Sequence, residues 1–515
     1  ITELVETGEL EYYDELKASI PPGLIEMLDI TGMGPKKVKA VHEKLGIKTV
    51  KQLENACKKG KVAELDGFGQ KSEEKILEGI EFKRKHASHH HRHKMLLVAE
   101  PILDDLRSHP DVIRCDIAGS LRRGKEVSGD IDFLVSAKES EDIIHAFTTR
   151  EGILSILAAG KTKASVLLEG GIQADLRVVD DSEFASALAY FTGSKEHNIV
   201  MRSRAISRGL RLNEYGLFKS KEETRDPKLR LKSKTEDDIF AALGMAYVPP
   251  ELREDRGEFE AGEKNDIPKL IEWTHLKGSL HNHSNWSDGQ ETLEEIAEHM
   301  NDLGLAYWAI TDHSKASFQA NGLDSERVKK QLKEIGVLNQ KLEDEGNDFR
   351  LLSGIEVDVL KKGLDFDDDL LNQLDVVVAS MHVTGSEEMD NTNRLIKAVE
   401  NPNVHMIGHL SGRLLLERAP QKLNQIAVID ACAETGTWIE LNANPYRLDL
   451  DWRHWQYAKS KGVKCVINCD AHRNEHAGFL RIGTDIARKG WLTKADVINT
   501  LPLVKLHKEL SRKRG

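Results

Sequence analysis

Short apolar segments that end in a histidine or a carboxylate constrain the fold of this chain more than any other feature. From about residue 269 onward these segments alternate with helical stretches, and we expect each of them to be a strand. Alternation of strand and helix predicts a parallel sheet or barrel, in which the carboxyl ends of the strands gather at one mouth. The expected strands span residues 306–310, 351–355, 376–379, 405–407, 437–441 and 465–467.

Six histidine, aspartate and glutamate side chains lie just beyond those strands, two histidines lie at the end of a further strand near residue 280 and an aspartate follows on its loop, so we expect all nine to converge. Imidazole and carboxylate groups suit zinc, manganese or iron, and a hydroxide that bridges such metals attacks phosphorus at neutral pH. A single histidine at a strand end is more often structural, but nine groups with the same relation to strands predict a metal cage. The nine are His281, His283, Asp288, His313, Glu356, His382, His409, Asp470 and His472.

Three aspartates in the first half of the chain form a second candidate centre. Side chains alternate across a strand, so Asp130 and Asp132 point to one face of the strand expected around residues 131–135. Asp175 lies in another apolar strand, where an unpaired carboxylate is costly unless a cation or a hydrogen bond compensates it. Three clustered aspartates hold two cations about 3.5 to 4 Å apart, and Mg²⁺ is their natural occupant.

A loop suited to a triphosphate precedes these aspartates. It follows a helix expected over residues 96–106 and a strand expected over 112–117, and it reads Gly119-Ser120-Leu121-Arg122-Arg123-Gly124. Its small residues allow close approach, while its hydroxyl and guanidinium groups donate hydrogen bonds to phosphate. An Asp-x-Asp motif alone also suits a turn or a solvated edge, but the loop before it favours a nucleotide site.

A repeated Gly-x-Gly motif lies nearer the amino terminus. Its two copies have glycines 35 residues apart, and each opens an amphipathic helical run. The start of a helix leaves backbone N–H groups free for a phosphate, and glycine removes the Cβ atom that would block it. Residues 31–94 carry 16 Lys and Arg against 8 Asp and Glu, although the whole chain has a net charge of -12. We predict a DNA-backbone clamp formed by Gly32, Gly34, Lys36, Lys37, Gly67, Gly69 and Lys71.

Two further segments are expected to be links. The histidine-rich run 86–93 has no carboxylate or thiol nearby and adjoins basic residues, so we favour a solvated basic link over a metal site. The segment 248–266 is rich in proline, glycine and charge, which predicts the main linker between domains.

Together these motifs resemble bacterial family X DNA polymerases that carry a PHP domain. Residues 119–132 look like the palm of the nucleotidyltransferase superfamily. Tyr190-Phe191-Thr192-Gly193-Ser194, with Asn198, is similar to the nucleotide-binding segment of polymerases related to DNA polymerase beta. The Gly-x-Gly repeat resembles the helix-hairpin-helix DNA grip of that family. Most of the family's small amino-terminal domain has no counterpart here, and no lyase lysine matches.

The resemblance implies a role for each matching residue. Asp130, Asp132 and Asp175 would bind the metals of nucleotidyl transfer, with Asp175 assisting deprotonation of the primer 3′-hydroxyl. The nucleotide would contact Gly119, Ser120, Arg123, Gly129, Tyr190, Phe191, Gly193, Asn198 and Arg202. The nine strand-end groups would be the ligands of the PHP metal centre, and Asp312 would support that centre or cap its loop. Leu410 stands where polymerase-linked PHP domains usually carry proline, and the nearby Arg413 would contact a phosphate.

Resemblance and composition predict six segments along the chain. They are a remnant of an amino-terminal DNA-binding domain over 1–28, a helix-hairpin-helix domain over 29–94, an α/β nucleotidyltransferase palm over 95–180, a thumb over 181–246, a linker over 247–268 and a distorted (β/α)7 PHP barrel over 269–515.

We therefore expect a template-directed, gap-filling repair polymerase that uses two Mg²⁺ ions. Its PHP domain is expected to be a 3′→5′ exonuclease with up to three Mn²⁺ or Zn²⁺ ions, and to nick DNA at abasic sites. One alternative keeps the polymerase and makes the PHP domain a small-molecule phosphatase. Another is a DNA-end-binding scaffold with inactive sites. The expected partners are gapped or primer-template DNA and dNTPs, and the expected state is a monomer.

Composition bears on where such a protein works. The five cysteines lack a CxxC pair, which favours a reducing compartment and packing roles. No run of about 18 apolar residues is present to cross a bilayer. The chain begins with Ile1 and shows no secretion leader, so we expect a trimmed chain of a bacterial, cytoplasmic, nucleoid-associated protein rather than a secreted precursor.

Overall fold

The computed structural model describes residues 21–383 and 388–512. The chain divides into two compact units, residues 1–89 with 414–419 and residues 90–413 with 420–515. The remnant predicted over residues 1–28 lies mostly outside the described residues. Within the described ranges, no helix is both long enough and apolar enough to cross a membrane.

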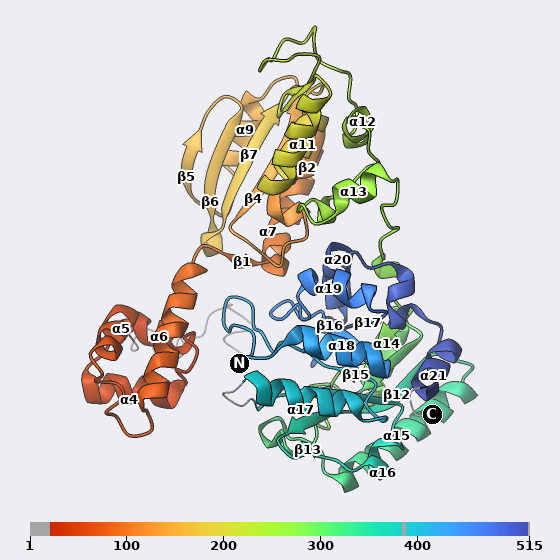
Figure 1. Ribbon diagram of the computed structural model, residues 1–515. Coiled ribbons are helices and arrows are strands. Elements are labelled where there is room, and N and C mark those ends of the chain that lie inside the picture. Colours follow the sequence, from red (N-terminus) through yellow and green to blue (C-terminus); the bar gives the residue numbers. More distant parts are fainter. Residues whose placement is uncertain (1–20, 384–387, 513–515) are drawn as a thin grey trace. The chain divides into compact units, whose positions relative to one another are not determined.

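The first unit is built from short helices joined by two glycine-rich turns (Figure 1). Its helices are α3 (Pro22–Leu28), α4 (Pro35–Leu45), α5 (Val50–Lys58) and α6 (Gln70–Lys85). Gly32 and Gly67 have φ of 93° and 80°, a region that favours glycine. Gly34 and Gly69 then cap the starts of α4 and α6. The predicted helix-hairpin-helix arrangement is confirmed.

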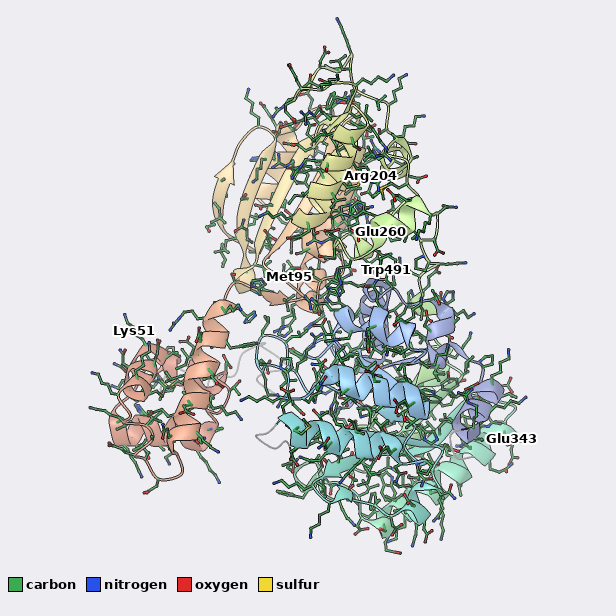
Figure 2. All side chains as sticks on the ribbon, in the orientation of Figure 1. Lys51, Met95, Arg204, Glu260, Glu343 and Trp491 are labelled. Atoms are coloured by element: carbon green, nitrogen blue, oxygen red, sulfur yellow. The ribbon has the colours of Figure 1, made fainter. Side chains whose placement is uncertain are left out.

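A five-stranded sheet with the order β2-β4-β7-β6-β5 opens the second unit. Its strands are β2 (Val112–Ile117), β4 (Asp130–Ala137), β5 (Ile153–Ala159), β6 (Lys163–Leu168) and β7 (Gln173–Val179). Strands β4 and β7 are parallel, and the other pairs are antiparallel. Helices α7 (Arg92–Ser108) and α9 (Glu141–Thr148) share a core with this sheet, in which Met95 is fully buried (Figure 2). The helix predicted over 96–106 and the strand predicted over 112–117 fall within α7 and β2.

A helical layer follows the sheet and forms a core of its own. Its elements are α10 (Phe184–Thr192), α11 (Lys195–Ser207), β8 (Arg211–Asn213), β9 (Gly216–Phe218), α12 (Glu236–Ala242), a 3-10 turn over Pro250–Leu252 and α13 (Glu258–Glu263). Trp491, from the last part of the chain, packs against this core (Figure 2).

The segment predicted as a linker, 247–268, contains several buried residues. Arg253 is 0% exposed and pairs with Glu236, while Glu258 is 0% exposed and lies 2.8 Å from His197 Nδ1. Residues 255–257 and 263–266 of the segment are exposed, whereas charged partners hold its buried residues in place. The positions of the domain boundaries themselves stay predictions.

The histidine run is also less solvated than we expected. Strand β1 (His90–His91) pairs with β3 (Val127–Ser128), and His91 is only 6% exposed. The pairing partner is more than 30 positions away, so local composition gave no signal for it. The prediction of a solvated link was wrong for this end of the run.

Seven parallel strands form a nearly closed barrel in the last part of the chain. In sheet order they are β10 (Gly278–Ser279), β11 (Tyr307–Ile310), β12 (Arg350–Leu360), β14 (Val376–Ser380), β15 (Met406–Ile407), β16 (Trp438–Asn442) and β17 (Cys465–Asn468). The short β13 (Gly363–Leu364) pairs antiparallel with β12. Beyond β10 and β17, the His283 N–H donates to the Ala471 carbonyl at 2.8 Å, which joins the two edges of the barrel.

Helices alternate with these strands, as the sequence predicts. They are α14 (Leu293–Asp302), α15 (Ser325–Asp344), α16 (Asp368–Leu371), α17 (Glu388–Glu400), α18 (Gln425–Thr435), α19 (Trp452–Ser460), α20 (Phe479–Lys489) and α21 (Leu503–Arg512). The predicted distorted (β/α)7 barrel is confirmed, and six of the seven strands overlap the segments chosen from the sequence. The very short β10 was not among them.

The ion pairs of Glu236 generate a stability prediction. Burial raises the pKa of Glu236, but Arg253 and Arg122 lower it to about 2, below the ordinary 4.5. The ionised carboxylate therefore stabilises the fold fully above about pH 4.5 and loses this effect as the pH falls toward 2. We expect Glu236→Gln to lower the Tm by an amount that corresponds to about 3 kcal/mol, because two buried arginines lose their partner.

Thermal unfolding from pH 8 down to pH 3 tests this expectation. The matched control is Glu260→Gln on α13, where the glutamate is exposed (Figure 2). The gap in Tm between wild type and Glu236→Gln should stay constant down to about pH 4.5 and narrow below it. Equal shifts in the two variants would contradict the role of this buried carboxylate.

Candidate metal centres

The three aspartates predicted from the first half of the chain lie together. Asp130 and Asp132 belong to β4, and Asp175 belongs to the neighbouring strand β7. The parallel register places Asp132 directly opposite Asp175. One carboxylate oxygen from each of the three lies within 4.8 Å of the others. The strands thus bring together the groups that two divalent cations require.

Repulsion among these carboxylates gives the cluster its electrostatic character. Burial raises the pKa of Asp132 to about 7, and the charges of Asp130 and Asp175 add to this effect. Gln173 donates to both oxygens of Asp175 at 3.3 Å, which orients that carboxylate. Divalent cations would remove the repulsion, so the donor set fits hard cations such as Mg²⁺.

The phosphate loop, residues 119–124, lies directly against this cluster. Gly119 has φ of 65°, and a Cβ atom there would lie 2.0 Å from Asp132 Oδ2. Only glycine allows this close approach of backbone and carboxylate. Gly129 immediately precedes Asp130, and Ser120 donates to the Ser128 hydroxyl at 2.8 Å.

Arg123, predicted to bind the triphosphate, is engaged by the protein itself. Its Nε lies 3.0 Å from Glu254, and its Nη1 donates to the Thr192 carbonyl at 2.7 Å. The neighbouring Arg122 donates to the Thr192 hydroxyl at 2.8 Å and pairs with Glu236. The loop and the turn after α10 are therefore tied together, and a triphosphate would have to share Arg123 with Glu254.

The predicted sugar-binding and base-binding residues surround that same turn. Tyr190 and Phe191 meet edge to face with ring centroids 5.3 Å apart. Asn198 donates to the carbonyls of Tyr190 at 2.7 Å and Gly193 at 3.2 Å, so it fixes the turn. A Cβ atom at Gly193 would lie 2.6 Å from Asn198 Oδ1. Arg202 lies one helical turn further along α11 and is half-buried.

The predicted DNA-clamp residues lie at the two helix starts of the first unit. A Cβ atom at Gly34, Gly67 or Gly69 would meet no described atom within 4 Å, so these turns are open. Lys36 and Lys71 are exposed there. Lys37 lies over the Phe68 ring at 5.2 Å, and Gly32 faces Lys75.

The barrel brings all nine of its predicted residues together. His281, His382, His409 and Asp470 each follow the last residue of a strand by two positions. The possible ligand atoms form three groups, and within each group the atoms lie within 4.8 Å of one another. These groups are His283, Asp288, His313 and His472; His281, His283 and Asp470; and His313, Glu356 and His382.

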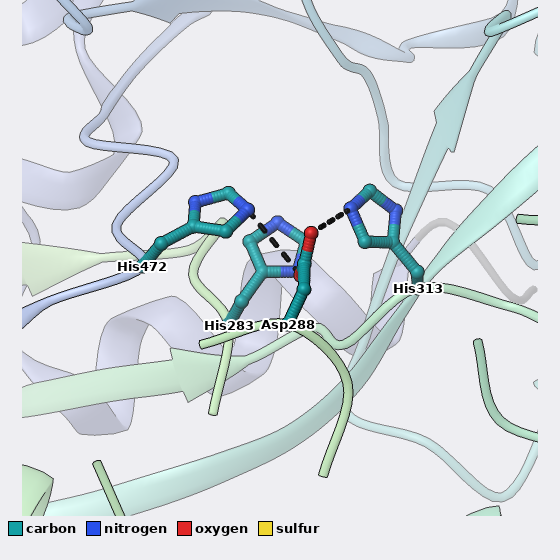
Figure 3. Close-up of side chains that lie close together, drawn as sticks. All are labelled: His283, Asp288, His313 and His472. Atoms are coloured by element: carbon teal, nitrogen blue, oxygen red, sulfur yellow. Dashed lines mark ion pairs between the residues drawn. The ribbon is translucent and has the colours of Figure 1, made fainter. Parts of the chain in front are cut away.

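The most open of these groups is drawn in Figure 3. Asp288 lies between two histidines, with His472 Nε2 at 3.4 Å from one oxygen and His313 Nε2 at 3.6 Å from the other. The ring of His283 stacks on both of these imidazoles, with centroids 4.4 and 4.3 Å apart.

Glu356 is the hub of the deeper part. It is 1% exposed, and its oxygens lie 2.7 Å from His313, 3.0 Å from His409 and 3.3 Å from both His281 and His382. A single glutamate surrounded by four imidazoles cannot satisfy all of them with hydrogen bonds. Shared cations would satisfy them together.

Orphaned ligand atoms show that metals fit this site. His281 Nε2 and His283 Nδ1 are buried and meet no hydrogen-bond partner among the described residues. Burial lowers the pKa of His283 to about 3, so this imidazole stays neutral and able to bind a metal. Burial raises the pKa of Glu356, but the surrounding histidines hold it well below its usual range.

Sequence reasoning missed several residues that orient the ligands. Glu440 is fully buried in β16, and its carboxylate lies 2.7 Å from His281 Nδ1 and accepts from the His409 N–H at 2.6 Å. Asp358 lies 2.8 Å from His382 Nδ1. The signal for Glu440 was present in the sequence, because a carboxylate in an apolar strand demands a partner, as at Asp175.

Asp312 supports a loop rather than the ligands directly. It is fully buried and accepts hydrogen bonds from the Ser284 N–H at 2.8 Å, the Ser284 hydroxyl at 2.6 Å and the Gln331 amide at 2.5 Å. It thereby fixes the segment between His283 and Asp288. Arg413 is buried and paired with Glu126 and Asp451, so it is not placed as a free phosphate contact.

Four family models match successive parts of the chain. They are the SAM-like helix-hairpin-helix tandem over residues 24–81, the DNA polymerase beta palm over 91–190, the DNA polymerase beta thumb over 187–254 and the PHP domain over 279–444.

Individual proteins are similar to the whole chain or to parts of it. The DNA polymerase/3'-5' exonuclease PolX of Bacillus subtilis (strain 168) is 38% identical over 99% of this chain and 89% of that protein. The Probable phosphatase Teth514_1060 of Thermoanaerobacter sp. (strain X514) is 27% identical over 44% of this chain and 88% of that protein. The structure of Leishmania infantum polymerase beta in a ternary P/T complex has a TM-score of 0.29 and 24% identity, over 45% of this chain and 99% of that one.

The contact between Gly119 and Asp132 generates one prediction. Gly119→Ala would push Asp132 away from the other two aspartates, and a displacement of about 1 Å lowers the rate of nucleotide addition about a hundredfold. Primer extension with dNTPs measures this loss. Gly336→Ala in α15, where a Cβ atom meets nothing within 4 Å, is the matched control and should keep full activity. Full activity of Gly119→Ala would show that the contact is unimportant.

Glu440 generates a second prediction. Glu440→Gln removes the charge that orients His281 and should weaken metal binding in the barrel about 10- to 100-fold. Metal content after dialysis, measured by elemental analysis, reports the change without any assay of activity. The control is Glu434→Gln on the exposed face of α18. Equal metal content in both variants would show that Glu440 does not support metal binding.

Proposed function

Because this chain belongs to the bacterial family X DNA polymerases with a PHP domain, we propose that its two clusters are separate centres for synthesis and hydrolysis of DNA. It is a DNA polymerase with a 3′→5′ exonuclease. The assignment of Asp130, Asp132 and Asp175 to synthesis, and of the barrel cluster to hydrolysis, is our inference. The observation that carries it is the convergence of two complete ligand sets on different scaffolds.

The three-aspartate cluster has the groups needed for nucleotidyl transfer. The cluster would hold cations that would lower the pKa of the primer 3′-hydroxyl and neutralise charge on the leaving pyrophosphate. Asp130 and Asp132 would hold these cations, and Asp175 would hold one of them and accept the proton of the hydroxyl. Gln173 keeps the Asp175 carboxylate oriented for that step.

The phosphate loop and the turn after α10 would hold the nucleotide. Gly119, Ser120, Arg123 and Gly129 would bind the triphosphate, with Arg123 exchanging part of its pairing with Glu254. Tyr190, Phe191 and Gly193 would contact the sugar and disfavour a 2′-hydroxyl. Asn198 and Arg202 would reach the minor-groove edge of the new base pair.

The barrel cluster would hold up to three Mn²⁺ or Zn²⁺ ions, one for each group of ligand atoms. These residues would hold metals that would supply a nucleophile for hydrolysis of the phosphodiester. Glu440, Asp358 and Asp312 hold the ligands in place, which limits rearrangement on metal binding. The mixture of imidazoles and carboxylates is compatible with several transition metals, so the choice of Mn²⁺ or Zn²⁺ is part of the proposal.

Gapped DNA suits the rest of the molecule. The lysines and open glycine turns of the first unit provide N–H groups and positive charge for backbone phosphates in a sequence-independent manner. We therefore propose repair synthesis on gapped or primer-template DNA by a monomeric protein. Nicking at abasic sites is an additional activity that the same hydrolytic centre would support. The free cysteines suit the reducing cytoplasm, where chromosomal DNA lies.

A phosphatase activity of the barrel is the second candidate. The similarity of this part to a probable phosphatase favours it. Hydrolysis of single-stranded DNA compared with hydrolysis of a phosphate monoester by the same preparation separates the two. Faster hydrolysis of the monoester would overturn the exonuclease assignment. An inactive DNA-end-binding scaffold would bind DNA but show neither reaction with Mg²⁺ or Mn²⁺.

Separate centres predict separable activities. Asp130→Ala should abolish primer extension and leave shortening of single-stranded DNA intact, because it removes a ligand of only one cluster. His281→Ala combined with His283→Ala should have the opposite effect. A gapped duplex with a labelled primer, incubated with dNTPs in Mg²⁺ and then in Mn²⁺, shows lengthening and shortening in one assay. A single folded variant that loses both activities would contradict two independent centres.

A further inference from the structure

Helix α20 of the barrel contacts the phosphate loop of the polymerase half with two side chains. Asp485 and Lys489 are four residues apart, so they lie on one face of the helix. Lys489 Nζ donates to the Arg123 carbonyl at 2.9 Å. Asp485 pairs with Arg92 at 2.7 Å, and Arg92 donates in turn to the Leu121 carbonyl. Both contacts therefore end on the main chain of the loop that we propose holds the triphosphate.

Lys489 is the more unusual of the two. Its side chain is 0% exposed, although an ammonium group is costly to bury unless it is fully paired. Besides the Arg123 carbonyl, its Nζ donates to the Glu251 carbonyl at 3.2 Å and to Glu254 at 2.7 Å. It also lies 4.5 Å from the centre of the Trp452 ring. The three hydrogen-bond partners of Lys489 Nζ all belong to the polymerase half of the chain.

Glu254 connects Lys489 to the Arg123 side chain. The same carboxylate that accepts from Lys489 lies 3.0 Å from Arg123 Nε and 3.3 Å from Lys125. Burial raises the pKa of Glu254, but these three cations lower it to about 2, so the carboxylate is ionised. Because Glu254 is shared between the two cations, Lys489 weakens the ion pair between Glu254 and Arg123. Lys489 also fixes the position of the Glu254 carboxylate.

We propose that Lys489 is a positioning residue for nucleotide addition, so that the hydrolytic domain sets part of the geometry of the synthetic centre. It acts on the backbone of Arg123 directly and on its guanidinium through Glu254. This inference rests on the proposed function, in which Arg123 binds the triphosphate. Loss of Lys489 removes the hydrogen-bond donor of the Arg123 and Glu251 carbonyl groups. Glu254 would then pair only with Arg123 and Lys125.

Steady-state kinetics with Lys489→Met tests the proposal in the full chain. Methionine has similar length and volume but neither charge nor donors. We expect the KM for dNTP on a gapped duplex to rise roughly tenfold, with a smaller change in kcat, because binding of the triphosphate is disturbed before the chemistry is. Shortening of single-stranded DNA by the same preparation should be unchanged, which also shows that the barrel is folded.

Lys459→Met is the matched control. Lys459 lies on α19, is half-buried and likewise pairs with a carboxylate and a carbonyl, those of Asp496 and Trp491, but both partners are in the barrel domain. It should leave the KM for dNTP unchanged. The double variant Lys489→Met with Glu254→Gln adds a coupling test: if Lys489 acts through Glu254, its effect on KM is smaller in that background than in the wild type.

Lys489→Gln keeps the test valid if the methionine variant does not fold. Its amide keeps a hydrogen-bond donor, one bond shorter than lysine, but carries no charge, so KM should rise by less than in Lys489→Met. An unchanged KM in whichever variant folds, or a KM effect that is the same with and without Glu254, would overturn the proposal. Absence of dNTP addition by the wild type would instead refute the proposed function on which it rests.

Discussion

Parallel pairing of strands is the constraint on which both centres depend. Two neighbouring parallel strands begin at one edge of a sheet and end at the opposite edge, so side chains near the same end of both strands are brought within reach of one another. In the palm, the aspartates lie at the starts of β4 and β7, and the register of these strands sets Asp132 opposite Asp175. In the barrel, seven parallel strands deliver their ligands to one mouth. The two reactions thus use one geometric solution to a shared problem, that of gathering mutually repelling carboxylates around cations.

Patterns that are local in sequence predicted most of this arrangement. The two-residue period of a strand identified Asp130 and Asp132 as a pair, and the strand-end histidines and carboxylates of the barrel converge as expected. Glu440 and Asp358 were missed, although a buried charge in an apolar run was already a usable signal. The strand expected over 351–355 continues to Leu360 as β12, so Glu356 lies within that strand and not after it, as does Asp358. Sequence patterns also placed the helix starts at Gly34 and Gly69 correctly.

Contacts between distant segments explain burial that local composition does not indicate. Residues 247–268 have the composition of a linker, yet Arg253 within them is fully buried and paired with Glu236. The pairing of β1 with β3 likewise buries part of a polar histidine run. In both cases, partners that are remote in sequence compensate the cost of desolvating polar groups. The composition of a short segment does not reveal such partners. The ionic contacts of α20 belong to the same class.

Closure of the barrel is coupled to its ligands. The backbone bonds that join the two barrel edges involve His281, His283, Asp470 and Ala471, and three of these four residues also carry candidate metal ligands. A metal ion that binds these imidazoles and this carboxylate therefore also stabilises the contact between the first and last strands of the barrel. By thermodynamic linkage, metal binding to this centre increases the free energy of unfolding of the closed barrel. Loss of metal therefore destabilises the fold as well as removing the hydrolytic activity.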